Sequence, residues 1–528
     1  MNTDVDVAVV GYGPTGQVLA SLLGRQGHRV AVFERWPSLY GMPRLTHIDG
    51  ETARIIQSAG DVDVALRDAS PAATYEWRNG NGDLLLALDW SGVSSGFAAH
   101  WTMYQPDIED SIHLRASSYP TVGIEQGVDV VGLVQHDDHV ALTVRPRSCD
   151  RDQQWEAPSA DRIVTARYVV GADGANSFVR RAIGVDCDDL GVDDRWLNID
   201  TECLRPLGDA FQVTQQFCDP VQPNMFMPIG QSRQRFEVAV RDDDPAEMAT
   251  EDYAWRWLHE RHGLGPTDVR ILRHVIYTFS ARTARRWQVG RVFLAGDAAH
   301  TMPPYMGQGA CSGMRDGITL AWKLSMVLTG AASADLLATY ETERRGHAEV
   351  IQRCAVELGR VANLKDPVAA AERDDMFRRG EVPPLPPFPT ITNGVVLPGS
   401  LAGTLGPQGL IVAERGRGRF DDLHRWGFTV VCSRDPHDVL STAQLAFLSS
   451  IGAAVATTAP GTPRSFEDAD GTYDHYFAEH GVEAYIERPD FHLFGAGSVD
   501  DLPSMVDALA LALGVDSSIE QVALVGGA

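Results

Sequence analysis

The hydrophobic pattern at the start of the chain predicts a strand, a tight turn and a helix in succession. The run Asp6–Val10 is short and rich in β-branched residues, which is typical of a strand buried on both faces. A glycine-rich turn follows at residues 11–16, and apolar residues then recur at helical spacing as far as Leu23. A second apolar run, Arg29–Phe33, ends at Glu34, so these segments together predict a β-α-β unit.

Two later stretches repeat the pattern of a strand that ends in a turn carrying a carboxylate. The first is Tyr168–Gly171, followed by Asp173, and the second is Gly290–Ala295, followed by Asp297. Another glycine-rich turn, at residues 307–309, then leads into a helical stretch over about 315–363. The N–H groups at the start of such a helix are free to meet an electron-rich ligand.

The middle and the C-terminal parts follow different patterns. Residues 185–285 carry alternating, strand-like runs without β-α-β periodicity, which predicts an antiparallel sheet. Prolines crowd residues 383–389, so residues 366–395 are expected to form an extended linker. Residues 396–528 predict a separate α/β unit, with strand-like runs at 427–432 and 484–487.

Composition narrows the class of protein. The 528 residues are enough for two or three packed units, and 44% hydrophobic with 22% charged residues is the balance of a globular chain. The formal net charge of -26 would repel nucleic acid and anionic lipid, so neither is expected as a partner. The only lysines are Lys323 and Lys365, and neither lies in a Walker-type phosphate loop, which excludes that class of nucleotide hydrolase.

Cysteine usage and hydropathy predict a cytoplasmic location. The seven cysteines are scattered, with no C-x-x-C pair for a redox dithiol or a zinc knuckle, so no metal site is expected. No apolar run reaches the roughly 18 residues that a membrane-spanning helix needs, and the N-terminus lacks the basic region and cleavage site of a signal peptide.

The first glycine-rich turn fits the G-x-G-x-x-G pattern of dinucleotide-binding folds. Gly11 makes the turn, Gly13 lets the backbone approach a pyrophosphate, and Gly16 lets helix and strand pack closely. Glu34 follows at the spacing expected for the acid that binds a ribose hydroxyl. NAD and FAD use the same unit, so this motif alone leaves the dinucleotide open.

The first glycine-rich turn and the two later stretches that carry Asp173 and Asp297, in this order, resemble the group A flavoprotein aromatic monooxygenases, the family of para-hydroxybenzoate and phenol hydroxylases. The likeness is greatest to 3-(3-hydroxyphenyl)propionate hydroxylases and covers residues 5–360. The segments that carry this closer likeness are Cys218–Pro220, Arg235–Glu237, Gly307–Gly309 and Gly313–Asp316. One departure is Cys311, where many relatives have Asn.

The resemblance implies an α/β fold with a Rossmann-like FAD-binding domain, an inserted antiparallel-sheet substrate domain and a thioredoxin-like C-terminal α/β domain. The implied boundaries are 1–184 and 286–365 for the FAD-binding domain, 185–285 with a segment from about 75–100 for the substrate domain, 366–395 for the linker and 396–528 for the C-terminal domain. The implied cofactors are FAD, which stays bound, and NADPH or NADH, which donates electrons transiently.

The resemblance also implies which residues hold the FAD. Glu34 and Arg35 would hold the adenosine ribose, Arg44 and Gln105 the ribityl-pyrophosphate region, and Val130 would lie against the adenine. Asp173 would lie near the pyrophosphate and the route of the nicotinamide, and Asp297 would bind the ribityl chain. Gly307 and Gly309 would present backbone N–H groups to the pyrimidine edge of the flavin.

The implied reaction is hydroxylation of a small phenolic substrate by O2 through a flavin hydroperoxide, in a pocket closed to water. The ring is activated when its hydroxyl shares a proton with an acceptor. The candidate substrate contacts are His47, Pro304 and Tyr305, with Thr46, Arg235 and Glu237 as further candidates. We expect the Pro304 carbonyl to be free to accept from a substrate hydroxyl.

Each of these candidates has a structural alternative. His47 has the alternative of a satisfied core histidine. Arg235 and Glu237 lie two residues apart and share one face of a strand, so an ion pair between them is the alternative to substrate binding.

Two other functions stay open at the level of sequence. A flavin-dependent halogenase shares the first glycine motif, although neither lysine is placed to carry a halogenating oxidant. A non-catalytic flavin-binding scaffold is the second alternative. Cys432 has no second thiol in its unit, so we expect that unit to act in packing or in a homodimer rather than in redox chemistry.

Overall fold

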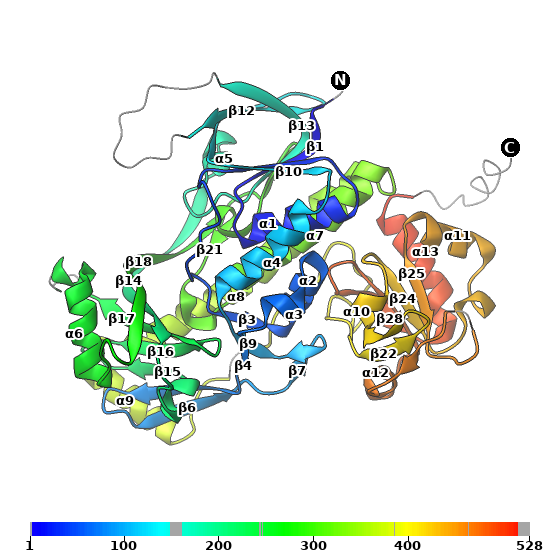
Figure 1. Ribbon diagram of the computed structural model, residues 1–528. Helices are drawn as coiled ribbons and strands as arrows, with labels where there is room; N and C mark the ends of the chain where they lie inside the picture. The colour runs from blue at the N-terminus through cyan, green and yellow to red at the C-terminus, as the bar shows by residue number, and fades with distance from the viewer. Residues whose placement is uncertain are drawn as a thin grey trace.

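The computed structural model describes residues 3–147, 161–241, 244, 246–384, 386–462 and 464–515. Figure 1 shows a large sheet with helices beneath it, a second large sheet beside this layer, and a smaller unit built from the C-terminal residues. Cys149, Leu385 of the proline-rich segment and residues 516–528 of the expected C-terminal unit lie outside the described residues. Within the described ranges, no helix is long and apolar enough to cross a membrane.

The first sheet has the predicted β-α-β unit at its centre. Its strands are β10 (Val122–Gln126), β2 (Val30–Glu34), β1 (Val5–Val10), β13 (Arg162–Gly171), β12 (Val140–Pro146) and β11 (Val128–Gln135), with β20 (Val292–Leu294) beside β13 and β19 (Gln288–Val289) beside β20. Strands β10, β2, β1, β13 and β20 are parallel. Val7, Ala8 and Val9 of β1 are fully buried, which confirms a strand covered on both faces.

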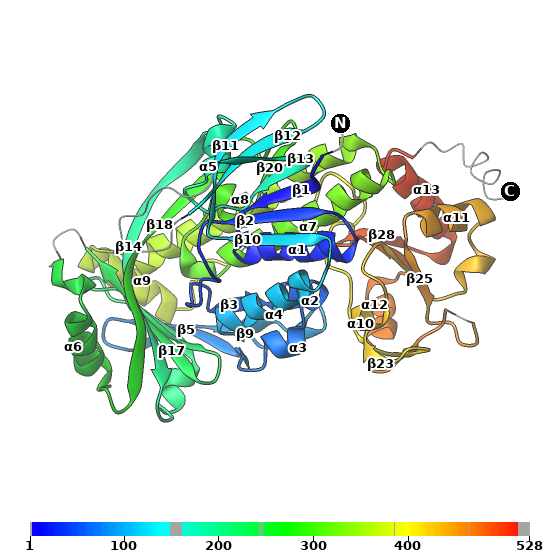
Figure 2. The same ribbon diagram turned by 45° about the horizontal axis from the view of Figure 1, so that its top comes forward.

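Helices line the underside of this sheet, as Figure 2 shows. They are α1 (Pro14–Arg25), α4 (Gln105–Ser117), α7 (Gly309–Thr329) and α8 (Thr339–Ala362), with the short α5 (Phe178–Ala182) after β13. The helical stretch expected over 315–363 is therefore two helices, the first of which starts earlier, at Gly309. Gly330 ends α7 because it adopts the left-handed conformation, with φ of 76°.

The second sheet has eight strands. In spatial order they are β21 (His300–Thr301), β18 (Val269–Ala284), β14 (Cys187–Cys203), β17 (Arg233–Val240), β16 (Asn224–Ile229), β15 (Thr214–Cys218), β5 (Thr74–Asn79) and β6 (Leu84–Asp89). Its strands come from residues 185–285, from the segment near 75–100 and, in β21, from residues 290–309, which hold Asp297 and the glycine-rich turn after it and which we call the flavin motif. All neighbours are antiparallel except β15 and β5, which are parallel.

The two faces of this second sheet have different partners. Helix α6 (Glu251–His262) covers the outer face, where Trp257 and Leu258 pack on Phe236 and Val238. On the inner face, Trp77 and Trp196 pack in one cluster with Tyr305. The inner face is thus turned toward the flavin motif, which contains Tyr305.

The expectation of a linker over the whole of 366–395 is wrong for its first part. Helix α9 (Pro367–Arg378) begins after Asp366, whose side chain accepts a hydrogen bond from the Val368 N–H, and proline is favourable at a first helical position. Phe377 of α9 is buried against the second sheet. The extended segment starts after α9 and includes the prolines.

The C-terminal unit contains two small sheets. The four-stranded sheet has the order β25 (Ala454–Thr457), β24 (Thr429–Cys432), β27 (Ala484–Glu487) and β28 (Leu493–Gly497), and the three-stranded sheet has β23 (Gly416–Arg419), β22 (Leu410–Ala413) and β26 (Glu467–Asp468). Its helices are α10 (Phe420–Leu423), α11 (Thr442–Ser450), α12 (Thr472–His480) and α13 (Leu502–Ala512). The unit shares one continuous hydrophobic core with the first sheet and its helices.

Short elements connect these parts. They are α2 (Gly50–Ala59), α3 (Val62–Ala65), β3 (His47–Asp49), β9 (His100–Thr102), β4 (Ser70–Pro71), β7 (Val93–Ser94) and β8 (Phe97–Ala98). The flavin motif contains two single turns of 3₁₀ helix, η3 (Gly296–Ala298) and η4 (Pro304–Met306).

Candidate functional site

The first glycine turn is packed tightly on one side and open on the other. Gly11 has φ of 99°, and a Cβ there would overlap the Ala172 carbonyl, while a Cβ on Gly16 would overlap the Gly11 carbonyl oxygen. A Cβ on Gly13, in contrast, would meet no atom within 4 Å. Helix α1 begins immediately after Gly13, and no side chain caps it. Its first N–H groups are therefore available to a ligand in the open space.

A second helix start lies close to the first. Gln308 precedes α7 without a side-chain cap, and a Cβ on Gly309 would meet only Met302, at 3.7 Å. Thr15 links the two helices, because its Oγ1 is the nearest atom to the Cβ positions of both Gly296 and Gly313. Two uncapped helix N-termini thus approach one another, which suits a ligand with two separated electron-rich groups.

The carboxylates at the strand ends are held in place by backbone N–H groups and one side-chain hydroxyl. Glu34 accepts hydrogen bonds from the Tyr12 N–H at 2.7 Å and the Trp36 N–H at 2.9 Å. Asp173 accepts from the Ser177 hydroxyl at 2.5 Å and from the Val179 N–H at 3.0 Å. Both side chains are thereby fixed at the carboxyl ends of β2 and β13, beside the glycine turn.

Asp297 and Arg44 are close enough to interact electrostatically. The Asp297 side chain is exposed to solvent. The protein atoms around its carboxyl group nevertheless desolvate it and raise its pKa, and His300 and Arg44 act in the opposite direction. Gln105 holds the Arg44 segment, because its Oε1 accepts from the N–H groups of Arg44 at 2.9 Å and Leu45 at 2.7 Å. A carboxylate, an arginine and a helix start are thus brought together from three distant segments.

Arg35 and Val130 lie at the margin of this region. Arg35 is exposed, next to the Trp36 ring, with 5.9 Å between its guanidinium carbon and the ring centroid. Val130 is buried in β11, beside the irregularity at which Val131 drops out of the pairing with β12. Neither residue makes a contact that distinguishes a ligand role from a structural one.

One cross-strand row of the second sheet is hydrogen-bonded to the loop that carries Arg44. The row is Met227, Arg235, Asp200 and Arg273 on four adjacent strands. Arg235 binds both oxygens of Asp200, at 2.6 and 3.1 Å, and donates to the carbonyls of Arg44 at 2.8 Å and Pro43 at 2.9 Å. We call these four residues the anchor row.

The anchor row is completed by Arg273 and Met227. Arg273 donates to Asp200 at 2.8 Å and also to the Pro43 carbonyl. Thr46 donates from its Oγ1 to the sulfur of Met227 at 3.2 Å. The expected ion pair between Arg235 and Glu237 exists only as a longer contact of 3.6 Å, because Asp200 is the principal partner of Arg235.

Tyr305 and Pro304 lie together in η4, and Tyr305 packs against the inner face of the second sheet. The Tyr305 ring contacts Trp196 with 6.4 Å between centroids, and its hydroxyl donates to Asp194 at 3.1 Å and accepts from Asn363. The Pro304 carbonyl has a local partner that was not expected, since it accepts from the Gly307 N–H at 2.8 Å within η4. The hydrogen bond between Gly307 and Pro304 is the one that closes this turn of 3₁₀ helix. The second lone pair of the Pro304 carbonyl can still accept from a substrate hydroxyl, so that role stays a prediction.

His47 lies between the flavin motif and a group of aromatic side chains. Its Nδ1 is buried without a hydrogen-bond partner beside Gly307, and its Nε2 is 2.9 Å from Nδ1 of His100. Trp90 stacks on His100 with 4.6 Å between ring centroids and lies 4.8 Å from the His47 ring. Burial lowers the pKa of His47 to about 4, so its imidazole is neutral near pH 7.

Sequence reasoning missed four residues of this region: Asp200, Arg273, His100 and Trp90. Alternation along a strand can assign Arg235 to a face, but it does not say which residue of another strand faces it. His100 begins the three-residue strand β9 and Trp90 follows the end of β6, so neither lies in a segment long enough to show periodicity. No local signal in the sequence connects these four residues to the site.

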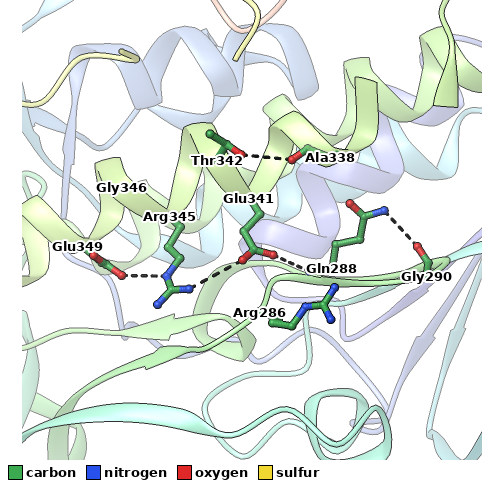
Figure 3. A pocket seen from close by; sticks show the side chains of 9 residues that line it. All are labelled: Arg286, Gln288, Gly290, Ala338, Glu341, Thr342, Arg345, Gly346 and Glu349. Carbon is green, nitrogen blue, oxygen red and sulfur yellow. Dashed lines mark hydrogen bonds and ion pairs between the residues drawn. The ribbon is translucent and has the colours of Figure 1, made fainter. Parts of the chain in front are cut away.

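A groove lined by charged side chains lies away from these residues. Figure 3 shows this groove of about 550 Å³ between α8 and the β19 region, with Arg286 and Gln288 on one side and Glu341, Arg345 and Glu349 on the other. Its charges largely satisfy one another, since Arg345 pairs with Glu349 at 2.9 Å and with Glu341 at 3.8 Å. None of the predicted site residues lines it.

The geometry therefore defines a dinucleotide-binding protein whose second sheet is turned toward the flavin motif. The chain belongs to the FAD binding domain family, which matches residues 4–355, and residues 403–512 match the HcaD C-terminal domain family. The expected resemblance to the group A flavin monooxygenases is thereby confirmed.

Named relatives cover nearly the whole chain. It is 35% identical over 505 residues to a probable NADH-specific resorcinol 4-hydroxylase of Rhodococcus jostii (strain RHA1), covering 93% of this chain and 92% of that protein. It is 32% identical over 540 residues to a 3-(3-hydroxy-phenyl)propionate/3-hydroxycinnamic acid hydroxylase of Mycobacterium sp. (strain JLS), covering 96% and 92%.

Solved structures share the fold at lower identity. The flavin-dependent monooxygenase PieE, in complex with FAD and substrate, superposes with a TM-score of 0.80 at 20% identity, covering 97% of this chain and all of that one. Aklavinone-11 hydroxylase, with FAD and aklavinone, has a TM-score of 0.77 at 23% identity and the same coverage.

Proposed function

We propose that this protein is a single-component, FAD-dependent monooxygenase that uses NADH or NADPH and O2 to hydroxylate a phenolic substrate. The observation that carries the proposal is the pairing of two uncapped helix N-termini, at Gly13 and Gln308, with a buried sheet face turned toward the second of them. The family match and the aromatic hydroxylases among the relatives support it.

The residues present fit an FAD. The open space at Gly13 and the N-terminus of α1 would hold the pyrophosphate, with Glu34 and Arg35 toward the adenosine ribose and Val130 toward the adenine. Arg44 and Asp297 would flank the ribityl region, and Asp173 would stay near the pyrophosphate through its fixed turn. When bound, the flavin supplies the oxygen-activating redox chemistry, which no side chain can provide.

The remaining tasks fall to the chain itself. Gly307 and Gly309 would offer backbone N–H groups at the start of α7. The second sheet, held to the Arg44 loop by the anchor row, would keep water from the reacting ring. The residues that would orient the substrate are His47, Thr46, Tyr305, Pro304 and Glu237.

A direct experiment tests this function. The purified protein should be yellow with bound FAD, and phenols should stimulate consumption of NADH or NADPH together with O2, yielding a product heavier by one oxygen atom. A colourless protein that takes up no FAD would contradict the proposal. Flavin without phenol-stimulated oxidation would favour the scaffold, and a halide-dependent product would favour the halogenase.

We also propose that the parts of the chain are the FAD-binding, substrate and C-terminal domains expected above, the last of them thioredoxin-like. The order β25-β24-β27-β28, with only β24 and β25 parallel, supports this topology. Cys432 is buried, and burial raises the pKa of its thiol, which disfavours the reactive thiolate. A structural role, a homodimer and a cytoplasmic location remain predictions.

A further inference from the structure

A second cross-strand row of the inner sheet face lies next to the anchor row. Its members, directly opposite one another on adjacent strands, are Trp77, Gln216, Met225, Glu237, Asn198 and Val275. We call it the middle row. Directly opposite residues point to the same face of a sheet, so all six share the inner face.

The middle row lies between two contacts with the flavin-binding part. On one side, Arg235 of the anchor row donates to the Pro43 and Arg44 carbonyls. On the other side, the next row contains Trp196, which packs on Tyr305. Glu237 is also close enough to Tyr75, a neighbour of Trp90, to raise the pKa of that tyrosine. The middle row therefore lies between the Arg44 loop on one side and Trp90 and Tyr305 on the other.

The middle row presents hydrogen-bond acceptors that lack donors. Gln216 Oε1 and Asn198 Oδ1 are buried without a hydrogen-bond partner. Glu237 is 4% exposed, and in the described part of the chain its sole polar contact is the Arg235 nitrogen at 3.6 Å. Buried polar groups are nearly always satisfied, so two unsatisfied amide oxygens beside a weakly paired carboxylate call for a ligand that brings donors.

Among the described residues of this sheet face, both arginines already have partners and are not free to pair with an anionic ligand. Arg235 and Arg273 are both committed to Asp200 and to the carbonyls of the Arg44 loop. Burial lowers the pKa values of His47 and His100, so both imidazoles are neutral near pH 7. A carboxylate group on the ligand would meet Glu237 without a guanidinium to neutralise it, which is unfavourable in a buried site.

We propose that Glu237 and Asn198 determine specificity by accepting hydrogen bonds from substrate hydroxyls, and that the site takes a neutral ring with two or more hydroxyls in preference to an aromatic acid. This inference rests on the proposed function, whose substrate class it narrows. Glu237 and Asn198 are cross-strand neighbours with Cβ atoms about 5 Å apart, a spacing that two hydroxyls in a 1,3 relation on one ring can span.

Binding to the FAD-loaded protein tests the inference without relying on turnover. Titration calorimetry at pH 8 with 1,3-dihydroxybenzene and with 3-(3-hydroxyphenyl)propanoate should give a Kd at least tenfold lower for the neutral diphenol. Glu237→Gln should raise the Kd of the diphenol tenfold or more and narrow its advantage over the acid. Glu76→Gln is the matched control, because Glu76 lies on the opposite face of β5 and pairs with Arg78.

Equal or tighter binding of the acid by the wild-type protein would overturn the inference, as would binding of neither ligand. Unchanged Kd values in a folded Glu237→Gln variant would also overturn it. If that variant does not fold, the comparison of the two ligands on the wild-type protein decides. Failure of the proposed function would look different, since neither ligand would then stimulate consumption of NADH and O2.

Discussion

Glu237 is buried on the inner sheet face, and no hydrogen-bond donor from the described residues stabilises its charged form. Burial is the largest influence on this carboxyl group and raises its pKa to about 7, against the opposing effect of Arg235. The folded protein thus holds a proton on Glu237 more tightly than the unfolded chain does. The stabilisation from the protonated form is complete below about pH 4.5 and is lost as pH rises to about 7.

Glu237→Gln should therefore stabilise the protein at high pH and change little at low pH. The amide is isosteric with the protonated acid but cannot ionise, so the variant escapes the cost of a buried charge. Melting temperatures of variant and wild type, measured from pH 5 to pH 8, should diverge as pH rises. A difference that does not depend on pH would contradict the assignment, and Glu76→Gln should show no such divergence.

Gly13 allows a cleaner test of the pyrophosphate position than its neighbours do. Gly13→Ala adds a methyl group where the protein itself has no atom within 4 Å, at a φ of -75° that any residue adopts. The apoprotein should keep its stability, while the Kd for FAD, measured by fluorescence titration, should rise at least tenfold because the methyl group would enter the space of the phosphates.

Gly346→Ala is the matched control for this substitution. Gly346 also has open space around its Cβ position, but it lies within α8 and away from both helix N-termini. This change should leave FAD affinity unaltered and slightly stabilise the helix. Normal FAD affinity in Gly13→Ala would remove the pyrophosphate from this turn.

At the scale of elements, the second sheet and the loop before β3 behave as one assembly. Asp200 on β14 collects two guanidinium groups, from β17 and β18, and these in turn hold the carbonyls of Pro43 and Arg44. Asp200 is fully buried, and both arginines donate hydrogen bonds to its carboxylate oxygens. The strands of the substrate face therefore set the position of a loop that would bind the cofactor.

Arg273→Lys should loosen this loop while the sheet stays folded. Lysine lacks the planar fork with which Arg273 reaches Asp200 and the Pro43 carbonyl together. We expect a threefold to tenfold rise in the Kd for FAD with a small change in Tm. Arg270→Lys is the control, since Arg270 lies on the same strand but is exposed and pairs with Glu202. Equal FAD affinity in both variants would show that the anchor row does not act on the loop.

At the scale of the whole molecule, buried charges join the C-terminal unit to the helices of the first sheet. Arg488 binds Glu343 of α8 at 2.7 Å and Asp490 at 2.7 Å, and Lys323 of α7 reaches Glu343 at 2.9 Å. All of these side chains are inaccessible to solvent. The Trp322 ring packs edge-on against Phe428 across the same boundary. The C-terminal unit is therefore part of the common core.

Arg488→Met should destabilise the protein by about 3–5 kcal/mol, because it leaves two carboxylates buried with one fewer cation. Chemical denaturation followed by tryptophan fluorescence measures this change in the free energy of unfolding. Arg379→Met serves as the control, since Arg379 forms an exposed pair with Glu381 and its loss should change the free energy of unfolding little. A loss near that of the control would argue against a shared core.

The sequence predicted the first β-α-β unit, the strands that end at Asp173 and Asp297, and the division into a middle sheet and a C-terminal unit. These features depend on local properties: alternation of apolar residues sets burial, and glycine allows the conformation that Gly11 requires. The sequence was misleading at α9. Pro367 stands at the first turn of this helix, where proline is favourable, but in sequence it resembles the prolines of the extended segment that follows.

Which residues face one another was decided only by the tertiary structure. Arg235 looked like a partner of Glu237 in sequence, but the sheet brings Asp200 and Arg273 to it and leaves Glu237 unsatisfied. The same is true of His47 and His100, which are distant in sequence and meet through the pairing of β3 with β9. Strand register and the packing of one sheet toward another depend on contacts across hundreds of residues, and local patterns along the chain do not encode them.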